Sequence, residues 1–570
     1  MIPLYARRLR RFERLLQRAS QVQRESLFAR IERCRDTQFG RDHGFASIRT
    51  LADFRRQVPV ARYDYFAPYI DAVARGEFHA LFPPQERVLR FTITTGSTGT
   101  PKLNPVTTTW LKEYRQAWDF WGVKVLLDHP DKVGHKILQM TGTWNMGQTP
   151  GGVPISMVSA LVARYQNPLV KPFYAIPHAV TDIPDTTARY YTMLRLSVAE
   201  RIGWICLMNP GTLLRLVEVG NEHRDELIRD LHDGTLSTAF DIPPQIRRQL
   251  APRVRRPARE CAKALEQVVR RTGTLYPKDY WQAPIIACWL GGTAGYQARY
   301  LRDYFGDVPL RDLGLVSSEG RHTIPLHNDK PEGVLAVTAN YYEFIPAAEA
   351  DAAQPTVLEA HELEVGRDYF LLMTTSSGYY RFNIGDIVRC HGFVGEAPVL
   401  EFLQKGDRCG DLEGEKVTEH QFVAAADEAA RSLGVRMGYI TAVPWRDGRE
   451  PPCYVVVVEH GNIPDLGTAY RFLETIDRAL MSSNFLYSAR RREQVVGPPR
   501  LLRIPTGAWS DFMRSEIARR GTGDVHYKHP GLVQEQSWLT SFTPVDTVIL
   551  TGDVARPSLA LQGCVPTTQT

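Results

Sequence analysis

The residues best suited to chemistry stand together in one short run, Thr-Thr-Gly-Ser-Thr-Gly-Thr-Pro-Lys. Glycines let backbone N–H groups approach phosphate oxygens, hydroxyls donate further hydrogen bonds, and a lysine offsets negative charge. The run lacks the Gly-Lys-Ser/Thr ending of a Walker loop, and the alternative is a surface loop rich in turn-forming residues. We interpret it as a phosphate-binding loop, with ligand contacts expected from Thr94, Thr95, Gly96, Ser97, Thr98, Gly99 and Lys102.

This phosphate-loop candidate stands between two predicted elements. Residues 91–97 show β-branched alternation, which indicates a strand entering a turn, and residues 108–121 have helical spacing. Helical patterns also occupy the first ninety residues and residues 187–233. Short apolar runs between residues 284 and 400, bounded by Gly, Pro or Ser, indicate a sheet.

A polar, glycine-punctuated stretch after Leu403 separates two segments that have their own apolar patterns. Beyond it we expect a helix over residues 416–433, a strand at CYVVVVEH and a helix around TAYRFLETIDRALM. The sequence therefore predicts a large domain over residues 1–404, a small α/β domain over 405–555 and a loose tail over 556–570.

Composition excludes several classes of protein. The 570 residues carry a formal charge of +6, but the basic residues are scattered, so no nucleic-acid partner is expected. No apolar run is long enough for a membrane span, and the first residues lack the apolar stretch of a secretory signal. The eight cysteines are widely spaced and suggest neither a disulfide framework nor a zinc site. We expect a soluble, cytoplasmic protein.

The run TTGSTGTPK resembles the phosphate loop of adenylate-forming enzymes. FGRDHGF, GEFHALF, GGVPISMVSAL, SSEG followed by NYYEFIP, YRFNIGDIV and GEKVTEHQ resemble, in order and spacing, the auxin-responsive promoter (Gretchen Hagen) family of acyl-acid amido synthetases. The resemblance implies an α/β fold. A large N-terminal adenylate-forming domain, with β-sheets and a β-barrel flanked by helices, would carry a small mobile C-terminal α/β domain.

The resemblance also implies roles for individual residues. Glu319 and Ser318 of SSEG are expected at the nucleotide, with Glu319 as the Mg²⁺ ligand; Mg²⁺ prefers hard oxygen ligands. Asp386 matches the aspartate that accepts the ribose hydroxyls. Without the resemblance, both acids read as ordinary turn residues. Further expected contacts are Gly292 and Thr293 at the adenine, Lys405 at the hinge, and Thr98 and Lys528 as catalytic residues with Glu319. Leu315 and Val316 depart from the Tyr-Gly that commonly precedes this motif.

Aromatic residues follow the phosphate-loop candidate at helical spacing: Trp110, Tyr114, Trp118 and Trp121 fall on one helix face. In the family this helix lines the acyl site, so Trp110, Tyr114 and Trp118 are expected to contact a flat aromatic or hydrophobic acid. The alternative is that the stripe belongs to the plain core.

The predicted function is an ATP- and Mg²⁺-dependent ligase that activates a carboxylic acid as acyl-AMP and transfers the acyl group to an amine or amino acid. An acyl-CoA or other thioester-forming ligase is the nearest alternative, and a non-catalytic nucleotide-binding relative is another. The acid, the amine and the pathway stay open, with secondary-metabolite biosynthesis one candidate. The expected state is a monomer or weak homo-oligomer.

Overall fold

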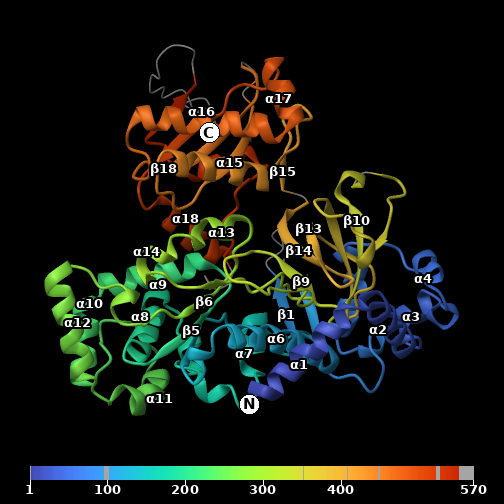
Figure 1. Ribbon diagram of the computed structural model, residues 1–570, viewed down its shortest axis with the longest axis horizontal. Helices are drawn as coiled ribbons and strands as arrows, with labels where there is room; N and C mark the ends of the chain where they lie inside the picture. Colours follow the sequence, from blue (N-terminus) through green and yellow to red (C-terminus); the bar gives the residue numbers. More distant parts are fainter. Residues whose placement is uncertain are drawn as a thin grey trace, which may run out of the picture. The chain divides into compact units, whose positions relative to one another are not determined.

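The computed structural model describes residues 2–94, 102–350, 352–406, 408–446, 448, 450–520 and 527–550. The chain separates into a larger compact unit that ends at Phe402 and a smaller one that begins at Leu403 (Figure 1). Both units mix helices and strands, which confirms the predicted α/β class with a large and a small part. The predicted domain limits at residues 404 and 555 stay predictions, and the predicted tail, residues 556–570, lies outside the described residues.

The chain begins with helices, as the sequence predicts for the first ninety residues. They are α1 (Ile2–Leu16), α2 (Ala19–Cys34), α3 (Gln38–Asp42), α4 (Leu51–Gln57) and α5 (Tyr63–Ala74). The side chains that these helices bury include Phe12, Leu27, Phe39 and Phe54, which join the main core of the larger unit. Helical spacing places such residues on one face of each helix, and that face packs inward.

Strands β1 (Val88–Thr94) and β2 (Lys102–Thr107) form an antiparallel pair, and β4 (Ile155–Ser156) adds to β1 in parallel. Helix α6 (Thr108–Asp128) follows β2 directly. The hydroxyl of Thr107 accepts a hydrogen bond of 3.1 Å from the Trp110 amide, which caps the first turn of α6. The strand and the helix predicted around the phosphate-loop candidate are therefore present.

A second sheet is fully parallel, in the order β3 (Lys136–Gln139), β5 (Ile202–Cys206), β6 (Ile285–Ala287) and β7 (Leu310–Arg311). Around it lie α7 (Val158–Arg164), α8 (Thr186–Ser197), α9 (Pro210–Glu222), α10 (Arg224–Asp233), α11 (Pro244–Val254), α12 (Arg259–Thr272), α13 (Gly292–Ala298) and α14 (Leu301–Phe305). Figure 1 shows α8, α9, α10 and α12 grouped on the side of β5 and β6.

The helical prediction for residues 187–233 was wrong in its middle, because Ile202–Cys206 form the strand β5. All five residues of β5 are buried between two neighbouring strands, and a short buried apolar run looks the same in a strand and in a helix. Gly203 allows the strand to pass His135, since an added Cβ would lie 2.5 Å from the His135 Cβ.

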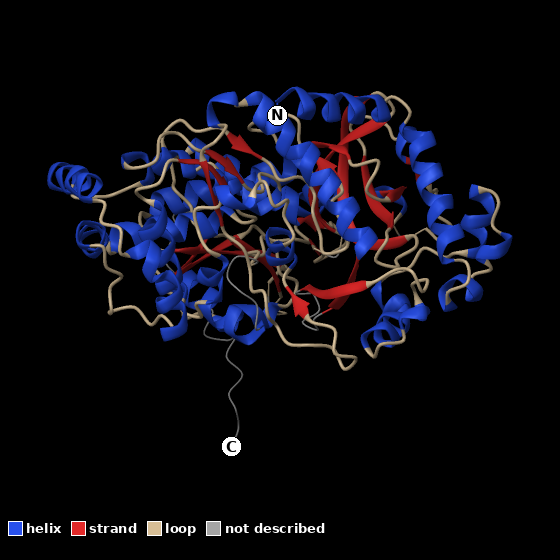
Figure 2. Ribbon diagram, turned by 90° about the horizontal axis from the view of Figure 1, so that it is seen from below, coloured by secondary structure: helices blue, strands red, loops and turns tan. Residues whose placement is uncertain are grey.

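The third sheet of the larger unit has seven strands, in the order β11, β10, β12, β13, β14, β9, β8. It lies largely in the region, residues 284–400, where the sequence predicted sheet. Its strands are β8 (Thr323–Ile324), β9 (Gly333–Leu335), β10 (Tyr341–Pro346), β11 (Leu358–Glu359), β12 (Asp368–Thr374), β13 (Phe382–Val394) and β14 (Ala397–Lys405). Figure 2 shows strands of the chain lying inward of helices.

The smaller unit contains a four-stranded sheet in the order β17 (Thr441–Trp445), β18 (Cys453–Glu459), β19 (Arg500–Ile504) and β20 (Asp546–Ile549), and a short pair, β15 (Cys409–Gly410) and β16 (Val417–Thr418). Its helices are α15 (Glu419–Ser432), α16 (Leu466–Ser483), α17 (Phe485–Arg492) and α18 (Ala508–Arg520). The predicted helix after the boundary, the CYVVVVEH strand and the next helix correspond to α15, β18 and α16. Among the described residues of both units, no helix combines the length and apolarity that crossing a membrane requires.

Candidate active site

The two ends of the phosphate-loop candidate meet across the β1–β2 pair. Thr94 at the end of β1 lies opposite Lys102 at the start of β2. The predicted contacts between them, Thr95, Gly96, Ser97, Thr98 and Gly99, lie outside the described residues. The antiparallel pairing of the strands therefore brings the two ends of the motif to one place.

The side chain of Lys102 lies against Tyr63 from α5, with its ammonium nitrogen 5.2 Å from the ring centroid. The Tyr63 hydroxyl accepts a hydrogen bond of 3.1 Å from the Leu103 amide and donates one of 3.2 Å to the Leu103 carbonyl. Burial raises the pKa of Tyr63 to about 12, so the phenol stays neutral and keeps its proton. Tyr63 thus positions the first residues of β2, a role that the sequence did not indicate.

Ser318 and Glu319 occupy a tight turn. The Ser317 amide donates to the Gly320 carbonyl at 2.9 Å, and Val316 and Arg321 are bridged on either side of the turn. Gly320 permits a close approach, because an added Cβ would lie 2.5 Å from the Asn340 side chain. Both Ser318 and Glu319 are buried, with exposures of 7% and 6%. The exposed turn glutamate that the residues alone suggested is therefore not what the structure shows.

Side chains from β2 and α6 hold this Glu319 turn through its backbone. The Asn104 amide nitrogen donates to the Ser318 carbonyl at 2.8 Å, and the Trp110 indole N–H donates to the Glu319 carbonyl at 2.7 Å. These contacts join residues more than 200 positions apart in the sequence, and they fix the turn to the strand–helix unit that follows the phosphate-loop candidate.

The predicted aromatic stripe faces the same turn. The rings of Trp110 and Tyr114 stack at a centroid distance of 4.6 Å, and both residues are almost fully buried in the core, whereas Trp118 is only half-buried. The Arg321 guanidinium lies 4.5 Å from the Trp118 ring centroid. Trp110 therefore has a structural role at Glu319, and the assignment of Trp110, Tyr114 and Trp118 as substrate contacts stays a prediction.

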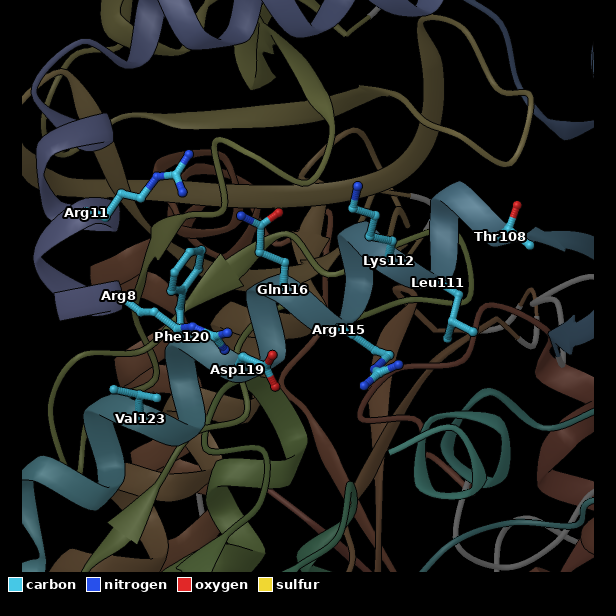
Figure 3. Close-up of a pocket in the computed structure, with 10 residues that line it drawn as sticks. All are labelled: Arg8, Arg11, Thr108, Leu111, Lys112, Arg115, Gln116, Asp119, Phe120 and Val123. Atoms are coloured by element: carbon cyan, nitrogen blue, oxygen red, sulfur yellow. The ribbon is translucent and has the colours of Figure 1, made fainter. Parts of the chain in front are cut away.

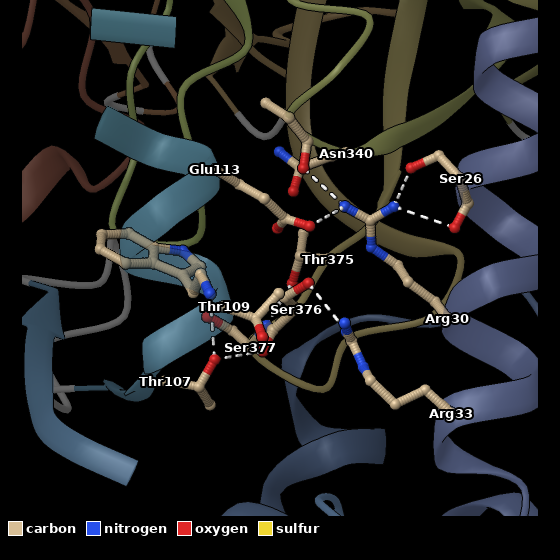
Figure 4. A network of polar contacts seen from close by, with 12 residues as sticks. Ser26, Arg30, Arg33, Thr107, Thr109, Glu113, Asn340, Thr375, Ser376 and Ser377 are labelled. Atoms are coloured by element: carbon tan, nitrogen blue, oxygen red, sulfur yellow. Dashed lines mark hydrogen bonds and ion pairs between the residues drawn. The ribbon is translucent and has the colours of Figure 1, made fainter. Parts of the chain in front are cut away.

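The opposite side of the α6 start is anchored by polar contacts (Figure 4). Arg30 of α2 donates to the Glu113 carboxylate at 2.8 Å and to the Ala339 carbonyl at 2.6 Å. Thr107 donates to the Ser376 carbonyl at 3.1 Å. Burial raises the pKa of Glu113 although the Arg30 charge opposes the rise. The helix is thus held from both sides, which keeps Trp110 in place at the Glu319 turn.

The predicted adenine segment begins α13, where Gly292 has a φ of +57° that favours glycine, and Thr293 follows in the first turn. Asp312 connects this segment to the one that leads to Glu319, because its carboxylate accepts hydrogen bonds from the Leu290 and Gly314 amides. Burial raises the pKa of Asp312 to about 7. Both segments follow the carboxyl ends of the paired strands β6 and β7, the edge at which open α/β sheets bind ligands.

Asp386 lies buried on β13, one residue after Gly385, whose φ is +80°. The approach to this strand is held by Arg381, a non-glycine residue with a φ of +50°. Its guanidinium donates to the Glu343 carboxylate at 2.8 Å, and Arg55 donates to the other Glu343 oxygen at 2.8 Å. This triad of half-buried Arg55 with buried Glu343 and Arg381 joins α4, β10 and the start of β13.

Tyr379 connects the Asp386 strand with the Glu319 turn. Burial raises the pKa of Tyr379 above its ordinary value, and the charge of Glu319 and the phenol of Tyr63 add to the rise. Because electrostatic effects weaken with distance, these contributions indicate that Glu319 and Tyr63 lie in the neighbourhood of Tyr379. The larger unit therefore brings Lys102, Ser318 and Glu319 together with the segment that leads to Asp386.

Lys405 and Lys528 belong to the smaller unit. Lys405 is the last residue of β14, and the Lys528 side chain is exposed between the buried residues Tyr527 and His529. The His529 Nε2 lies 2.9 Å from the Thr441 hydroxyl on β17, and burial lowers the pKa of His529 to about 3. His529 therefore ties the Lys528 segment to the sheet as a neutral side chain. The roles of both lysines stay predictions.

A separate hollow lies between α1 and the outer face of α6, on the opposite side of the helix from Trp110 and Tyr114 (Figure 3). Its volume is about 470 Å³. The lining residues are Arg8, Arg11, Thr108, Leu111, Lys112, Arg115, Gln116, Asp119, Phe120 and Val123. None of the predicted site residues lines this hollow, so we do not assign it to the active site.

Curated relatives match this chain along almost its full length. The indole-3-acetic acid-amido synthetase GH3.3 of Arabidopsis thaliana is 24% identical, over 94% of this chain and 92% of the relative. The indole-3-acetic acid-amido synthetase GH3.15 of the same plant is 26% identical, over 92% of each chain. The solved structure of AtGH3.15 acyl acid amido synthetase in complex with 2,4-DB matches with a TM-score of 0.84 at 21% identity, over 96% of this chain and 97% of that one, and supports the fold.

Family models match three successive parts of the chain. The GH3 family N-terminal domain covers residues 8–310, the GH3 family central domain residues 333–405 and the GH3 family C-terminal domain residues 420–537. Together they include well over half of the residues, and their order agrees with the motifs that the sequence presents. The chain belongs to the GH3 family.

Proposed function

We propose that this protein activates a carboxylic acid as its acyl-adenylate with ATP and then transfers the acyl group to an amine. The prediction of an amide-forming ligase is confirmed at the level of the family, since the full-length relatives are amido synthetases. The observation that carries the proposal for this chain is the Glu319 turn, which Asn104 and Trp110 hold against the strand–helix unit after the phosphate-loop candidate.

The nucleotide contacts follow from this arrangement as proposals. The loop from Thr94 to Gly99 and the Lys102 ammonium bind phosphate oxygens, and Asp386 accepts the ribose hydroxyls. Gly292 and Thr293 pass along the adenine. Asp386 is buried, which suits a carboxylate that binds paired hydroxyls away from water. The triad around Glu343 holds the start of the Asp386 strand in place.

A magnesium ion fits the chemistry of this donor set. Glu319 offers a hard carboxylate oxygen on a rigid turn, near the strand that begins with Lys102, and Mg²⁺ usually takes one or two protein carboxylates together with substrate phosphates. When bound, the ion would neutralise phosphate charge. Glu319 is the residue that would hold it.

Two displacements complete the proposed reaction. First, a carboxylate oxygen of the acid attacks the α-phosphorus of ATP, the bond from that phosphorus to the bridging oxygen breaks, and pyrophosphate leaves. Lys102 and Lys528 offset the charge on the phosphates, mainly by position. Second, the amine nitrogen attacks the acyl carbon, the bond to AMP breaks, and the nitrogen loses a proton. Lys405 stands at the segment about which we propose that the smaller unit moves between the two steps.

The substrates of the relatives do not define those of this chain. Their names specify indole-3-acetic acid, and the substrate classes proposed here are a small carboxylic acid and an amine or amino acid. A cytoplasmic location, a role in secondary metabolism and a monomeric or weakly oligomeric state are further proposals from the sequence.

The test is pyrophosphate release with ATP, Mg²⁺ and a panel of carboxylic acids, followed by mass spectrometry of the products after addition of amino acids or CoA. An acid-dependent release that yields an amide supports the proposal. A CoA thioester as the product would favour the thioester-forming alternative. A folded protein that binds ATP but releases no pyrophosphate with any acid would favour the non-catalytic alternative.

The Lys528→Ala variant tests the mechanism within that assay. We expect it to slow pyrophosphate release about 10- to 1000-fold while ATP binding, measured by calorimetry, changes much less, because the lysine acts mainly on the transferring phosphoryl group. The matched control is Lys263→Ala, which removes an exposed lysine paired with Glu260 on α12. Release at the control rate in Lys528→Ala would remove this lysine from the mechanism.

A further inference from the structure

Arg321 is a buried arginine two residues after Glu319. Its exposure is 0%, and it follows the Glu319 turn on the strand-like segment bridged to Val316. One guanidinium nitrogen, Nη2, donates to the Leu313 carbonyl. The other two, Nε and Nη1, have no hydrogen-bond partner among the described residues, and no other described residue has two such buried atoms.

The charge of Arg321 also lacks a carboxylate partner in the described part of the chain. Two other buried arginines of the larger unit have one, since Arg30 pairs with Glu113 and Arg381 pairs with Glu343. Buried Arg195 has none but donates from two nitrogens to backbone carbonyls, whereas Arg321 donates from one. The nearby Asp312 carboxylate is already bound by the Leu290 and Gly314 amides. Burial lowers the pKa of Arg321 to about 10, which leaves the group charged at neutral pH. A buried charge without its counter-charge is costly, and proteins rarely keep one without a use.

Aromatic rings lie close to this guanidinium. Its carbon lies 4.5 Å from the Trp118 ring centroid and 5.6 Å from that of Trp121. A planar guanidinium that lies against a ring still directs its N–H groups outward in its own plane. The rings therefore stabilise the cation without satisfying its donors, which leaves those donors for an oxygen acceptor.

The position of Arg321 separates it from the reacting end of the substrate. Trp110 marks the Glu319 end of α6 through its bond to the Glu319 carbonyl, and Trp118 marks the Arg321 end. The two tryptophans are eight positions apart on α6, or about 12 Å along the helix axis. An acid whose carboxylate reacts near Glu319 would reach Arg321 only with its far end. Burial raises the pKa of the Cys206 thiol and the charge of Arg321 opposes that rise, which indicates that the guanidinium lies near the carboxyl end of β5, on the ligand-binding edge of the parallel sheet.

We propose that Arg321 selects acids that carry a negatively charged oxygen group at the end remote from the reacting carboxylate, a second carboxylate being the simplest case. This inference rests on the proposed ligase function and names the substrate class of the same site. It replaces the hydrophobic acid expected from the aromatic stripe with an acid whose apolar middle lies along Trp110, Tyr114 and Trp118 and whose charged end meets Arg321.

The test uses matched pairs of acids in the pyrophosphate-release assay with the full chain. Octanoate is compared with octanedioate, and 3-phenylpropionate with 3-(4-carboxyphenyl)propionate. We expect the wild type to prefer the diacid of at least one pair by tenfold or more in kcat/KM. The preference should fall about 10- to 100-fold in Arg321→Met, the range for a hydrogen bond to a charged group. The diacid preference of Arg321→Lys should lie between those of the wild type and Arg321→Met, because lysine keeps the charge and loses the planar fork.

A stability measurement separates this role from a structural one. Without substrate, Arg321→Met should unfold at the same temperature as the wild type or higher, because methionine fills a similar volume without an uncompensated charge. The control Arg195→Met removes a buried arginine of α8, away from the site. The nitrogens of Arg195 donate to the Thr235 and Val254 carbonyls. This control should lose stability and keep the wild-type preference between acids. Unfolding of Arg321→Met would overturn the proposal, since the arginine would then serve the fold.

Other outcomes also decide the question. Equal use of both acids by the wild type, or an equal loss for both acids in Arg321→Met, overturns the selection by Arg321. Absence of release with every acid would instead contradict the ligase function. In that case calorimetric titration with octanedioate decides the role of Arg321: binding to the wild type that Arg321→Met loses supports it, and no binding or equal binding overturns it.

Discussion

The Glu319 turn and the Asp386 strand are both buried, but contacts of different kinds hold them. Neutral donors from Asn104 and Trp110 bind the backbone of the turn. The strand depends on charged groups, since Glu343 lies between the guanidinium groups of Arg381 and Arg55. A neutral hydrogen bond contributes modestly to stability and strongly to direction, whereas breaking a buried ion pair leaves a charge without a partner.

This difference indicates a division of roles. The turn needs accurate placement of one carboxylate and is aligned by short, directional bonds to its carbonyls. The strand needs to keep Arg381 in a left-handed conformation, a φ of +50°, which the surrounding contacts must stabilise. We therefore expect changes at the strand to affect stability first and changes at the turn to affect catalysis first.

The largest expected effect comes from the Glu343→Ala substitution. It leaves the buried Arg381 without its carboxylate, so the free energy of unfolding of the larger unit should fall by about 3–5 kcal/mol. Urea denaturation followed by tryptophan fluorescence measures the change. The control Arg270→Ala breaks an exposed pair with Glu266 on α12 and should change stability by less than about 0.5 kcal/mol. Similar losses in both variants would contradict the ionic half of the comparison.

The Trp110→Phe substitution tests the neutral half. Phenylalanine keeps a ring against Tyr114 but removes the donor to the Glu319 carbonyl, which should cost about 1–3 kcal/mol and slow pyrophosphate release about tenfold. Trp281→Phe is the matched control, because its buried indole donates to the Ser197 carbonyl at 3.1 Å, away from the site. We expect similar losses of stability in the two variants and a much larger loss of turnover in Trp110→Phe. Equal turnover would mean that the Trp110 bond does not align Glu319.

The segment around Lys528 extends the comparison to a titratable contact in the smaller unit. Burial lowers the pKa of His529 to about 3 from an ordinary 6.5, so below pH 6.5 the unfolded chain binds a proton that the folded chain does not. Stability should therefore fall as the pH falls from 6.5 toward 3, with a loss of about 1 kcal/mol from this group between pH 7.5 and 5.5. No such change is expected from this histidine above pH 7.5.

Denaturation of the wild type and of His529→Gln at both pH values measures this contribution. The variant is expected to be less stable at pH 7.5, since it loses the imidazole that packs against Tyr439 and Trp509, but its stability should depend less on pH. An equal pH dependence in the two proteins would show that His529 is not held neutral.

Local patterns predicted much of the fold. The helices of the first ninety residues, α6, α15, α16 and the strands β1 and β18 all appear where spacing indicated them. The pattern failed at β5, where Gly203 and four apolar residues look helical or extended with equal ease. Only the neighbouring strands β3 and β6 decide between these states, because they supply the hydrogen bonds that an extended segment needs.

The candidate site divides in the same way. Motifs singled out Lys102, Glu319 and Asp386, but no motif indicated that Asn104 would bind Ser318 or that Glu343 would pair with Arg381. The predicted substrate contact of Trp110 stays a prediction, and no motif indicated that its indole N–H would donate to the Glu319 carbonyl. These contacts join segments far apart in the chain, and spacing along one segment carries no information about the partner on another.

By itself the sequence indicated a candidate phosphate loop and the places of many helices and strands, since these patterns depend on neighbours along the chain, whereas the proposed metal and ribose residues were predicted from the family resemblance. The tertiary structure alone decided what each polar group meets once water is removed. Burial makes that choice consequential, because a donor or charge away from solvent must find a partner within the fold or in a ligand. Arg321 shows the difference. No motif in the sequence identifies this arginine, and its burial without a carboxylate partner among the described residues is the basis for the proposed contact with the substrate.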